Sequence, residues 1–289
     1  MTVAVLGAGG TMGGAMAVNI ARAGMRVRGW NRTAGRTQAL ADAGGELLAS
    51  PAEAAQGAEV IVSMLSDSDA VLDSMNGGSG ALEGARADAI WAQMGTIGEA
   101  GAARCAELAG EHGITFVDAP VLGTREPAQD GELVVLGSGP DREEVRERLR
   151  PIFQAVAART MWVGPAGAGT RLKLVANSWV LTVAEGAAEA AALAEGLGLD
   201  PRLLLEAVEG GPLDLPYLRS KSEAILARDF EPSFRLALAA KDAGLVQQAA
   251  ELHGLDLPLF DAIAARMREG AHEHGGEDLI ATYWKSAPR

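Results

Sequence analysis

Short apolar runs alternate with amphipathic segments along the first 165 residues or so of the chain. The runs predict strands, and the segments, whose apolar residues recur every three or four positions, predict helices. The expected strands are Thr2–Leu6, Arg26–Trp30, Glu46–Leu48, Val60–Leu65, Ala89–Met94, Thr115–Asp118, Leu133–Gly137 and Arg159–Val163. The expected helices between them include Met12–Ala23, Thr33–Ala43, Asp69–Met75, Glu99–His112 and Asp141–Val156. Continuous apolar strands separated by helices are typical of a mainly parallel sheet that helices cover on both faces.

The alternation ends at a glycine-rich segment, Gly164–Gly169, which predicts a hinge. Only helices and turns are expected beyond it. Their ranges are Thr170–Gly196, Pro201–Glu209, Pro216–Ala227, Leu236–His253, Leu257–Glu273 and Glu277–Lys285. The pattern therefore predicts an α/β N-terminal domain over residues 1–165 and an all-α C-terminal domain over residues 166–289, joined by a long helix.

The long helix expected over Thr170–Gly196 is rich in alanine and apolar on nearly all sides. Such a helix is usually buried, so we expect a homodimer or a higher homo-oligomer to cover part of it. Four large apolar residues of this half can either shape a pocket or fill the core, and core packing is the favoured interpretation. They are Trp179, Leu213, Phe230 and Phe234.

Charge and cysteine usage exclude several classes of protein. The formal net charge of −13 argues against a general affinity for nucleic acid or an anionic membrane, so an anionic ligand needs a local binding device. The first apolar run is too short for a signal peptide or a membrane span. A single cysteine, Cys105, cannot form an intrachain disulfide, and we expect a cytoplasmic protein. The four histidines are scattered, so no metal site is expected.

A glycine-rich loop, Gly7–Gly14, follows the first strand directly and precedes a helix. Glycines there allow a tight turn and a close approach of backbone N–H groups to a pyrophosphate, and the helix N-terminus favours the anion. The spacing is one residue longer than the commonest form, and a plain turn is the alternative. The position favours a Rossmann-type dinucleotide site, whose expected contacts from this loop are Gly7, Gly9, Gly10, Thr11 and Met12.

The residues after the second strand predict which dinucleotide binds. An acidic residue at this point would bind the ribose 2′-hydroxyl of NAD, but the chain has Asn31, Arg32 and Thr33 instead. A guanidinium pairs well with a 2′-phosphate, so Arg32 favours NADP(H), with Asn31 and Thr33 as further donors. The alternative is that Arg32 is a solvated charge and Thr33 a helix cap. Turns after the fourth and fifth strands, with Met64, Leu65 and Thr96, are also expected to line the cofactor.

Lys173 and Asn177 lie four residues apart near the start of the long helix and share a helical face. Apolar neighbours can lower the proton affinity of a lysine, which suits acid–base chemistry, and an asparagine can hold a substrate oxygen. An ordinary surface lysine fits the spacing equally well. A second lysine, Lys241, either pairs with Asp242 in solvent or reaches the cofactor.

Four blocks in this order resemble the β-hydroxyacid dehydrogenase family, which includes 3-hydroxyisobutyrate dehydrogenases and glyoxylate/succinic semialdehyde reductases. They are Met12–Ala17, Asp118–Gly123, Gly169–Asn177 and Lys241–Leu245. The stretch Pro120–Leu133 is most similar to the semialdehyde reductase branch. The resemblance extends over almost the whole chain.

The resemblance implies a role for each matching position. Lys173 matches the catalytic lysine that exchanges a proton with the substrate oxygen, and Asn177 matches a substrate-binding asparagine. Thr96 matches a residue beside the nicotinamide, and Lys241 a lysine that closes over the cofactor. The last match is a turn that holds the substrate carboxylate, with Leu122, Gly123 and Thr124 as the substrate-binding residues.

One departure concerns the substrate. Leu122 stands where the family typically has a serine, and an apolar side chain cannot donate to a carboxylate. The first hypothesis is an NADP(H)-dependent reductase of a small aldehyde or keto acid, or a dehydrogenase of a β-hydroxyacid. The second is an imine reductase of the same architecture, against which Lys173 and Asn177 argue. The third is a non-catalytic NADP-binding protein.

Overall fold

The structure, a computed structural model, describes residues 1–33 and 38–288 of the chain. It divides the chain into two units, Met1–Lys173 and Leu174–Arg289. Part of the expected helix Thr33–Ala43 falls on residues 34–37 and lies outside the described residues. Its described portion is α2 (Gln38–Asp42).

The first unit is built on a parallel sheet, as the apolar runs predict. Within the described ranges, six strands form it in the order β3-β2-β1-β4-β5-β6. They are β1 (Thr2–Leu6), β2 (Arg26–Trp30), β3 (Glu46–Leu47), β4 (Val60–Ser63), β5 (Ile90–Gln93) and β6 (Thr115–Asp118), every pair parallel. The chain runs outward from β1 to β3 and then returns to place β4 on the other side of β1. This reversal makes the carboxyl ends of β1 and β4 the switch point, where ligands of such sheets bind.

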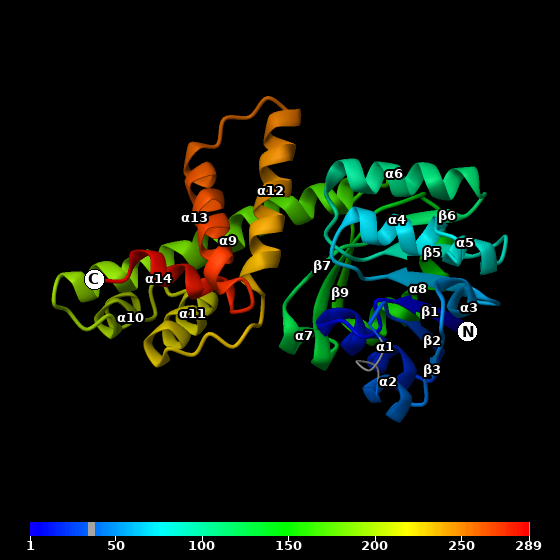
Figure 1. Cartoon of the computed structure of the whole chain (residues 1–289), viewed down its shortest axis with the longest axis horizontal. Helices are drawn as coiled ribbons and strands as arrows, with labels where there is room; N and C mark the ends of the chain where they lie inside the picture. Colours follow the sequence, from blue (N-terminus) through cyan, green and yellow to red (C-terminus); the bar gives the residue numbers. More distant parts are fainter. Residues whose placement is uncertain (34–37, 289) are drawn as a thin grey trace. The chain divides into compact units, whose positions relative to one another are not determined.

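Alternate residues of each strand pack against helices on opposite faces of the sheet. Val3 and Val5 of β1 belong to a buried cluster with α1 (Thr11–Arg22) and α8 (Glu143–Val156). Ala4 and Leu6 of the same strand belong to a second cluster. Its helices are α3 (Pro51–Ala55), α4 (Ser68–Asn76), α5 (Ala81–Gly84) and α6 (Gly98–Glu111), of which α4 and α6 are seen above the sheet in Figure 1. A strand has a period of two, so runs that are apolar at every position are buried on both faces.

A second, smaller sheet completes this unit and was not predicted. In the part of the chain described, β7 (Val121–Leu122), β8 (Leu133–Gly137) and β9 (Ala157–Trp162) form it, with β7 antiparallel to β8. The two-residue strand β7 is too short to leave a pattern, and α7 (Arg125–Asp130) follows it. The strand expected over Arg159–Val163 begins earlier, because α8 passes into β9 at Ala157 with no loop between them.

The second unit is helical, as expected. Its helices are α9 (Ala168–Gly196), which begins in the first unit, α10 (Arg202–Val208), α11 (Pro216–Ala227), α12 (Leu236–Leu252), α13 (Pro258–His274), η1 (Leu279–Thr282) and α14 (Tyr283–Ser286). Side chains from α9, α11, α12, α13, η1 and α14 form one buried cluster. None of the helices over residues 1–33 and 38–288 is long and apolar enough to span a membrane.

The helix expected over Glu277–Lys285 is wrong in its first half. Asp278 is buried and accepts hydrogen bonds from Lys221 Nζ (2.8 Å) and from the backbone N–H groups of Ser233 and Phe234. A carboxylate held in this way caps the 3₁₀ turn η1, which begins at Leu279, so a regular α-helix cannot start at Glu277.

Of the four large apolar residues expected to fill the core of the C-terminal half, only two do so. Phe230 and Phe234 pack against the buried cluster of the second unit. Trp179 is 62% exposed and Leu213 67% exposed, so the core interpretation is wrong for both. Since α9 also exposes Val175 and Leu193, its apolar residues are not all used in the core of this chain.

Candidate active site

The glycine loop turns at Gly7, which has a φ of +97° directly after β1. A Cβ atom on Gly7 would lie 2.2 Å from Met64 O, and one on Gly13 would lie 2.4 Å from Gly7 O. The backbone at Gly7 therefore touches the turn at Met64, and the backbone at Gly13 touches Gly7, so neither position has room for a side chain. Gly10, the residue before α1, is exposed, and the first turn of α1 carries no acidic side chain. This helix end fits an anion, because its N–H groups and the helix dipole meet no competing charge.

The loop is tied to the end of β2, where Arg32 follows. Gly7 N and Ala8 N both donate to Trp30 O, at 2.8 and 3.0 Å. Asn31 Nδ2 donates to Thr33 O at 2.9 Å, which closes the turn that carries Arg32. Arg32 and Thr33 are exposed. The guanidinium thus follows the strand next to the glycine loop, at the same edge of the sheet.

Buried polar side chains hold the turns after β4 and β5. Trp91 Nε1 donates to Ser63 Oγ at 2.8 Å, and Ser63 Oγ donates to Gln93 Oε1 at 3.0 Å. Gln93 Nε2 in turn donates to Gly95 O at 2.8 Å. This chain of bonds fixes the backbone next to Thr96. Because a Cβ atom on Gly95 would lie 2.7 Å from Leu65 O, the two turns are also in direct contact. Met64, Leu65 and Thr96 are half-buried at this edge.

The start of α9 is attached to the same edge. Asp118, the last residue of β6, accepts hydrogen bonds from Thr170 N and Thr170 Oγ1, both at 2.8 Å. Burial raises the pKa of the Asp118 carboxyl, and the bonds from Thr170 oppose this shift. Lys173 follows Thr170 by three residues, about one helical turn, and is half-buried. The first unit therefore brings the predicted lysine, the glycine loop and the turn with Thr96 to the carboxyl ends of its strands.

Asn177 is held by a carboxylate of the second unit. It is buried, and its Nδ2 donates to Asp242 Oδ2 at 2.7 Å. Asp242 is also buried, and its Oδ1 lies 2.6 Å from Lys241 Nζ. A carboxylate is an acceptor, so this contact orients the amide and turns Asn177 Oδ1 away from Asp242. Asp242 thus links two residues that were singled out separately.

The predicted substrate turn belongs to the small sheet. Leu122 ends β7 and is half-buried, and Gly123 is exposed with a φ of +123°. A Cβ atom on Gly123 would lie 2.6 Å from Leu133 Cδ2, so the turn is closed tightly over β8. Thr124 precedes α7 with an extended backbone. The turn is thus part of the first unit, in a different sheet from the glycine loop.

Two of the residues in these contacts were missed by sequence reasoning. Asp118 was noticed only as part of a family block, and Asp242 only as part of another block and as a possible surface partner of Lys241. A carboxylate at the end of a buried strand, or on a buried helix face, is the signal that could have found them, since buried carboxylates are almost always paired.

Two sequence profiles of known families match the chain. One, described as the NAD-binding domain of 6-phosphogluconate dehydrogenase, matches residues 2–164. The other, described as NAD-binding of NADP-dependent 3-hydroxyisobutyrate dehydrogenase, matches residues 167–283. The chain belongs to the β-hydroxyacid dehydrogenase family. The resemblance drawn from the four sequence blocks is confirmed, and so is the expectation of an oxidoreductase.

The chain is also similar to individual relatives and solved structures. Glyoxylate/succinic semialdehyde reductase 1 of Arabidopsis thaliana is 29% identical over 262 residues, which cover 91% of this chain and 90% of that protein. The structure of 3-hydroxyisobutyrate dehydrogenase from Mycobacterium tuberculosis with L-serine has a TM-score of 0.86 and 29% identity, and 98% of each chain is covered. An imine reductase from Myxococcus stipitatus in complex with NADP⁺ has a TM-score of 0.68, 20% identity and 98% coverage of each chain, and shares the fold.

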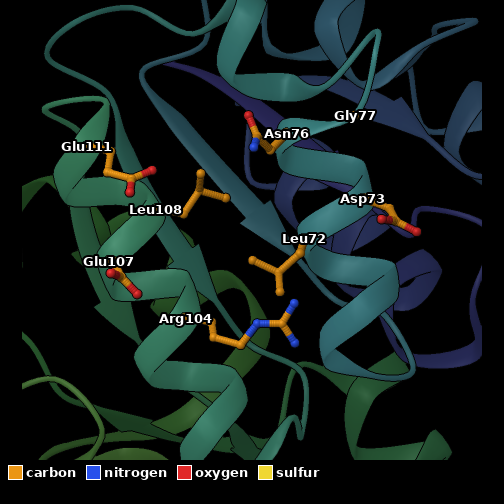
Figure 2. A pocket seen from close by; sticks show the side chains of 8 residues that line it. All are labelled: Leu72, Asp73, Asn76, Gly77, Arg104, Glu107, Leu108 and Glu111. Atoms are coloured by element: carbon orange, nitrogen blue, oxygen red, sulfur yellow. The ribbon is translucent and has the colours of Figure 1, made fainter.

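A hollow of about 310 Å³ on the first unit lies elsewhere (Figure 2). Leu72 and Leu108 lie between α4 and α6, and Asp73, Arg104 and Glu111 are among the polar residues around them. Each helix runs antiparallel to the strand before it. The C-terminal turns of α4 and α6, which line the hollow, therefore lie toward the amino ends of the strands. The hollow is therefore not the dehydrogenase site. No group of three or more metal-ligating side chains occurs in residues 1–33 and 38–288.

Proposed function

We propose that this β-hydroxyacid dehydrogenase relative is NADP(H)-dependent and reduces a small aldehyde or keto acid, or oxidises a β-hydroxyacid. One observation carries the proposal: the helix turn before Lys173 is hydrogen-bonded to Asp118, at the carboxyl end of β6. A lysine is thereby attached to the same edge of the sheet as the glycine loop. An ordinary surface lysine would need no such attachment.

The residues present fit NADP(H). The touching backbones at Gly7 and Gly13 and the uncapped N-terminus of α1 suit a pyrophosphate. Arg32, exposed after β2 where NAD-binding chains carry an acid, suits a 2′-phosphate. Met64, Leu65 and Thr96 would line the rest. When bound, this cofactor supplies the hydride for a carbonyl carbon or accepts one from a carbinol carbon.

The side chains of the protein handle the proton. We assign to Lys173 Nζ the donation of a proton to the carbonyl oxygen during reduction and its removal from the hydroxyl during oxidation. Asn177 would bind the same substrate through its amide, with the orientation that Asp242 imposes. Lys241 would bind the cofactor as a cation, and its ion pair with Asp242 holds its ammonium in place.

The substrate class follows from Leu122. A half-buried leucine offers no hydrogen bond, so the Leu122–Thr124 turn can bind a carboxylate only through Thr124 or backbone N–H groups. We therefore place less polar carbonyl compounds beside the semialdehydes and keto acids that relatives are named for. An imine reductase of the same architecture is the alternative, and Lys173 and Asn177 argue against it. A non-catalytic NADP-binding protein is the third possibility, against which the attachment of the Lys173 helix argues.

We also propose that the chain forms a homodimer or higher homo-oligomer in the cytoplasm. Val175, Trp179 and Leu193 of α9 are 62–65% exposed, a cost that a second copy would remove. The single thiol of Cys105 agrees with a reducing compartment. Light scattering at micromolar concentration tests the assembly, and a monomer would contradict it.

A single variant tests the enzymatic proposal. Lys173→Ala should lose nearly all NADPH oxidation with aldehydes and keto acids, while NADPH still binds with unchanged affinity. The wild type should be screened in parallel with NADH and with cyclic imines. Near-normal carbonyl turnover by Lys173→Ala overturns the proposal, and turnover of imines alone favours the alternative.

A further inference from the structure

Two buried side chains cap the start of α9, and the proposed chemistry uses neither. Asp118 and Ser138 are both completely buried. Ser138 Oγ accepts from Gly169 N at 2.9 Å and donates to Asp118 Oδ2 at 3.0 Å. Asp118 Oδ2 accepts from Thr170 N at 2.8 Å. Two N–H groups in the first turn of α9 are therefore bound by side chains that come from the ends of two different sheets.

The contact fixes the helix along its axis. A Cβ atom on Gly169 would lie 2.3 Å from Leu136 O and 3.1 Å from Asp118 O. The backbone of α9 thus touches the strand ends, and any other residue at Gly169 would push it away. Ala119 N also donates to Gln93 O at 2.8 Å, which joins the Asp118 backbone to the strand before Thr96.

The contact also fixes rotation about the helix axis. Thr170 Oγ1 donates to Asp118 Oδ1 at 2.8 Å, so one side chain of the first turn must face β6. Thr170, Lys173 and Asn177 follow one another at i, i+3 and i+7 and share one face of α9. If the first turn rotated, Lys173 would rotate with it.

We infer that Asp118 is a positioning residue that aims Lys173 at the reacting carbonyl oxygen through Thr170, with Ser138 as its support. The inference rests on the proposed function, because it assigns a consequence to the direction of Lys173. Asp118 itself touches neither cofactor nor substrate in this scheme. Misplacing a catalytic group by about 1 Å costs on the order of a hundred-fold in rate, so the clamp should be visible in turnover.

A matched pair of variants at Thr170 tests the clamp. Thr170→Val keeps the shape and removes the hydroxyl donor, whereas Thr170→Ser keeps the donor. Thr182→Val is the control, because Thr182 lies on the same helix and its Oγ1 donates to Ser178 O, at 2.7 Å, within the helix itself. We expect Thr170→Val to lower kcat by about 10- to 100-fold, with the NADPH dissociation constant within about two-fold of wild type. Thr170→Ser and Thr182→Val should stay within about three-fold in kcat.

Each outcome decides between distinct claims. A Thr170→Val enzyme with wild-type kcat overturns the inference. A Thr170→Val enzyme whose NADPH dissociation constant rises by the same factor as its kcat falls also overturns it, because the loss then concerns cofactor binding and not the direction of Lys173. If Thr170→Val does not fold, Ser138→Ala replaces it, with the same expected fall in kcat and unchanged NADPH affinity. Lys173→Ala separates the two proposals. An inactive Lys173→Ala beside a fully active Thr170→Val overturns the inference alone, whereas an active Lys173→Ala overturns the proposed function.

Discussion

Glu185 is a buried carboxyl whose removal should stabilise the protein above neutral pH. It lies on α9 and is 4% exposed, and a contact with the Thr282 hydroxyl compensates its burial only in part. Its nearest cation is Arg266, whose Nε lies 3.5 Å from Oε1. Burial raises the pKa of Glu185 from 4.5 to about 7. The ionised form is therefore disfavoured in the folded chain.

The shift translates into stability with a definite sign. The unfolded chain releases the Glu185 proton near pH 4.5 and the folded chain near pH 7. Between these values the folded state binds more protons, so the free energy of unfolding falls as pH rises. At about 1.4 kcal/mol per pKa unit, the full penalty above pH 7 is about 3 kcal/mol. Glutamine mimics the protonated carboxyl, so Glu185→Gln should recover this amount.

Urea unfolding at two pH values measures the effect. At about pH 8 we expect Glu185→Gln to unfold with a free energy about 3 kcal/mol higher than wild type, and at about pH 5 the gain should shrink to about 1 kcal/mol or less. The control is Glu189→Gln, one turn further along α9, where the carboxylate is 59% exposed and lies 3.8 Å from Arg266 Nη2. It should change stability little at either pH. A gain that is equal at both pH values, or a loss at pH 8, refutes the reasoning.

Three further predictions concern separate contacts. Gly13→Ala places a Cβ atom 2.4 Å from Gly7 O and should weaken NADPH binding by about ten-fold or more, as measured by fluorescence titration. Unchanged affinity would show that the glycine loop does not bind the cofactor. Asp278→Asn leaves the buried ammonium of Lys221 without its carboxylate and should cost about 3–5 kcal/mol in urea unfolding, and a loss below 1 kcal/mol would show that the pair is solvated. Burial raises the pKa of Cys105 to about 12, so a thiol reagent at about pH 8 should label it only after unfolding, and rapid labelling of the native protein contradicts its burial.

Much of the first unit follows from local pattern. A run of consecutive apolar residues, such as Val60–Val62 of β4, is buried on both faces, and the helix that follows it must cover one of them. Once the glycine loop is placed after β1, the physics of parallel sheets puts the other turns at the same edge. That is why Thr96 and the turn after β4 could be singled out from the sequence. Four of the eight expected strands have the observed bounds, and the ends of the other four differ from the expected ones by a residue or two. The last residues of a strand depend on individual hydrogen bonds that a hydrophobic pattern does not encode.

Contacts between residues far apart in the chain could not be predicted in this way. Asp118 and Thr170 are 52 residues apart, and Asn177 and Asp242 are 65 apart. Nothing in the local sequence of a carboxylate tells which distant donor it will meet. The prediction that Trp179 packs in the core was wrong for a related reason. Its apolar character predicts burial, but whether a partner is found in the same chain depends on packing that periodicity does not encode.

The helix face that carries Thr170, Lys173 and Asn177 depends both on local spacing and on contacts between residues far apart in the chain. Helical spacing alone places the three side chains on one face of α9, and the sequence shows this. What the sequence does not show is that a buried carboxylate binds the residue on each side of Lys173: Asp118 binds Thr170 in the first unit, and Asp242 binds Asn177 in the second. A buried carboxylate is costly unless it is fully hydrogen-bonded, so each of these contacts holds its own part of α9 within its own unit. Under the function proposed for Lys173, the contact between Asp118 and Thr170 one turn earlier sets the direction in which Lys173 offers its proton.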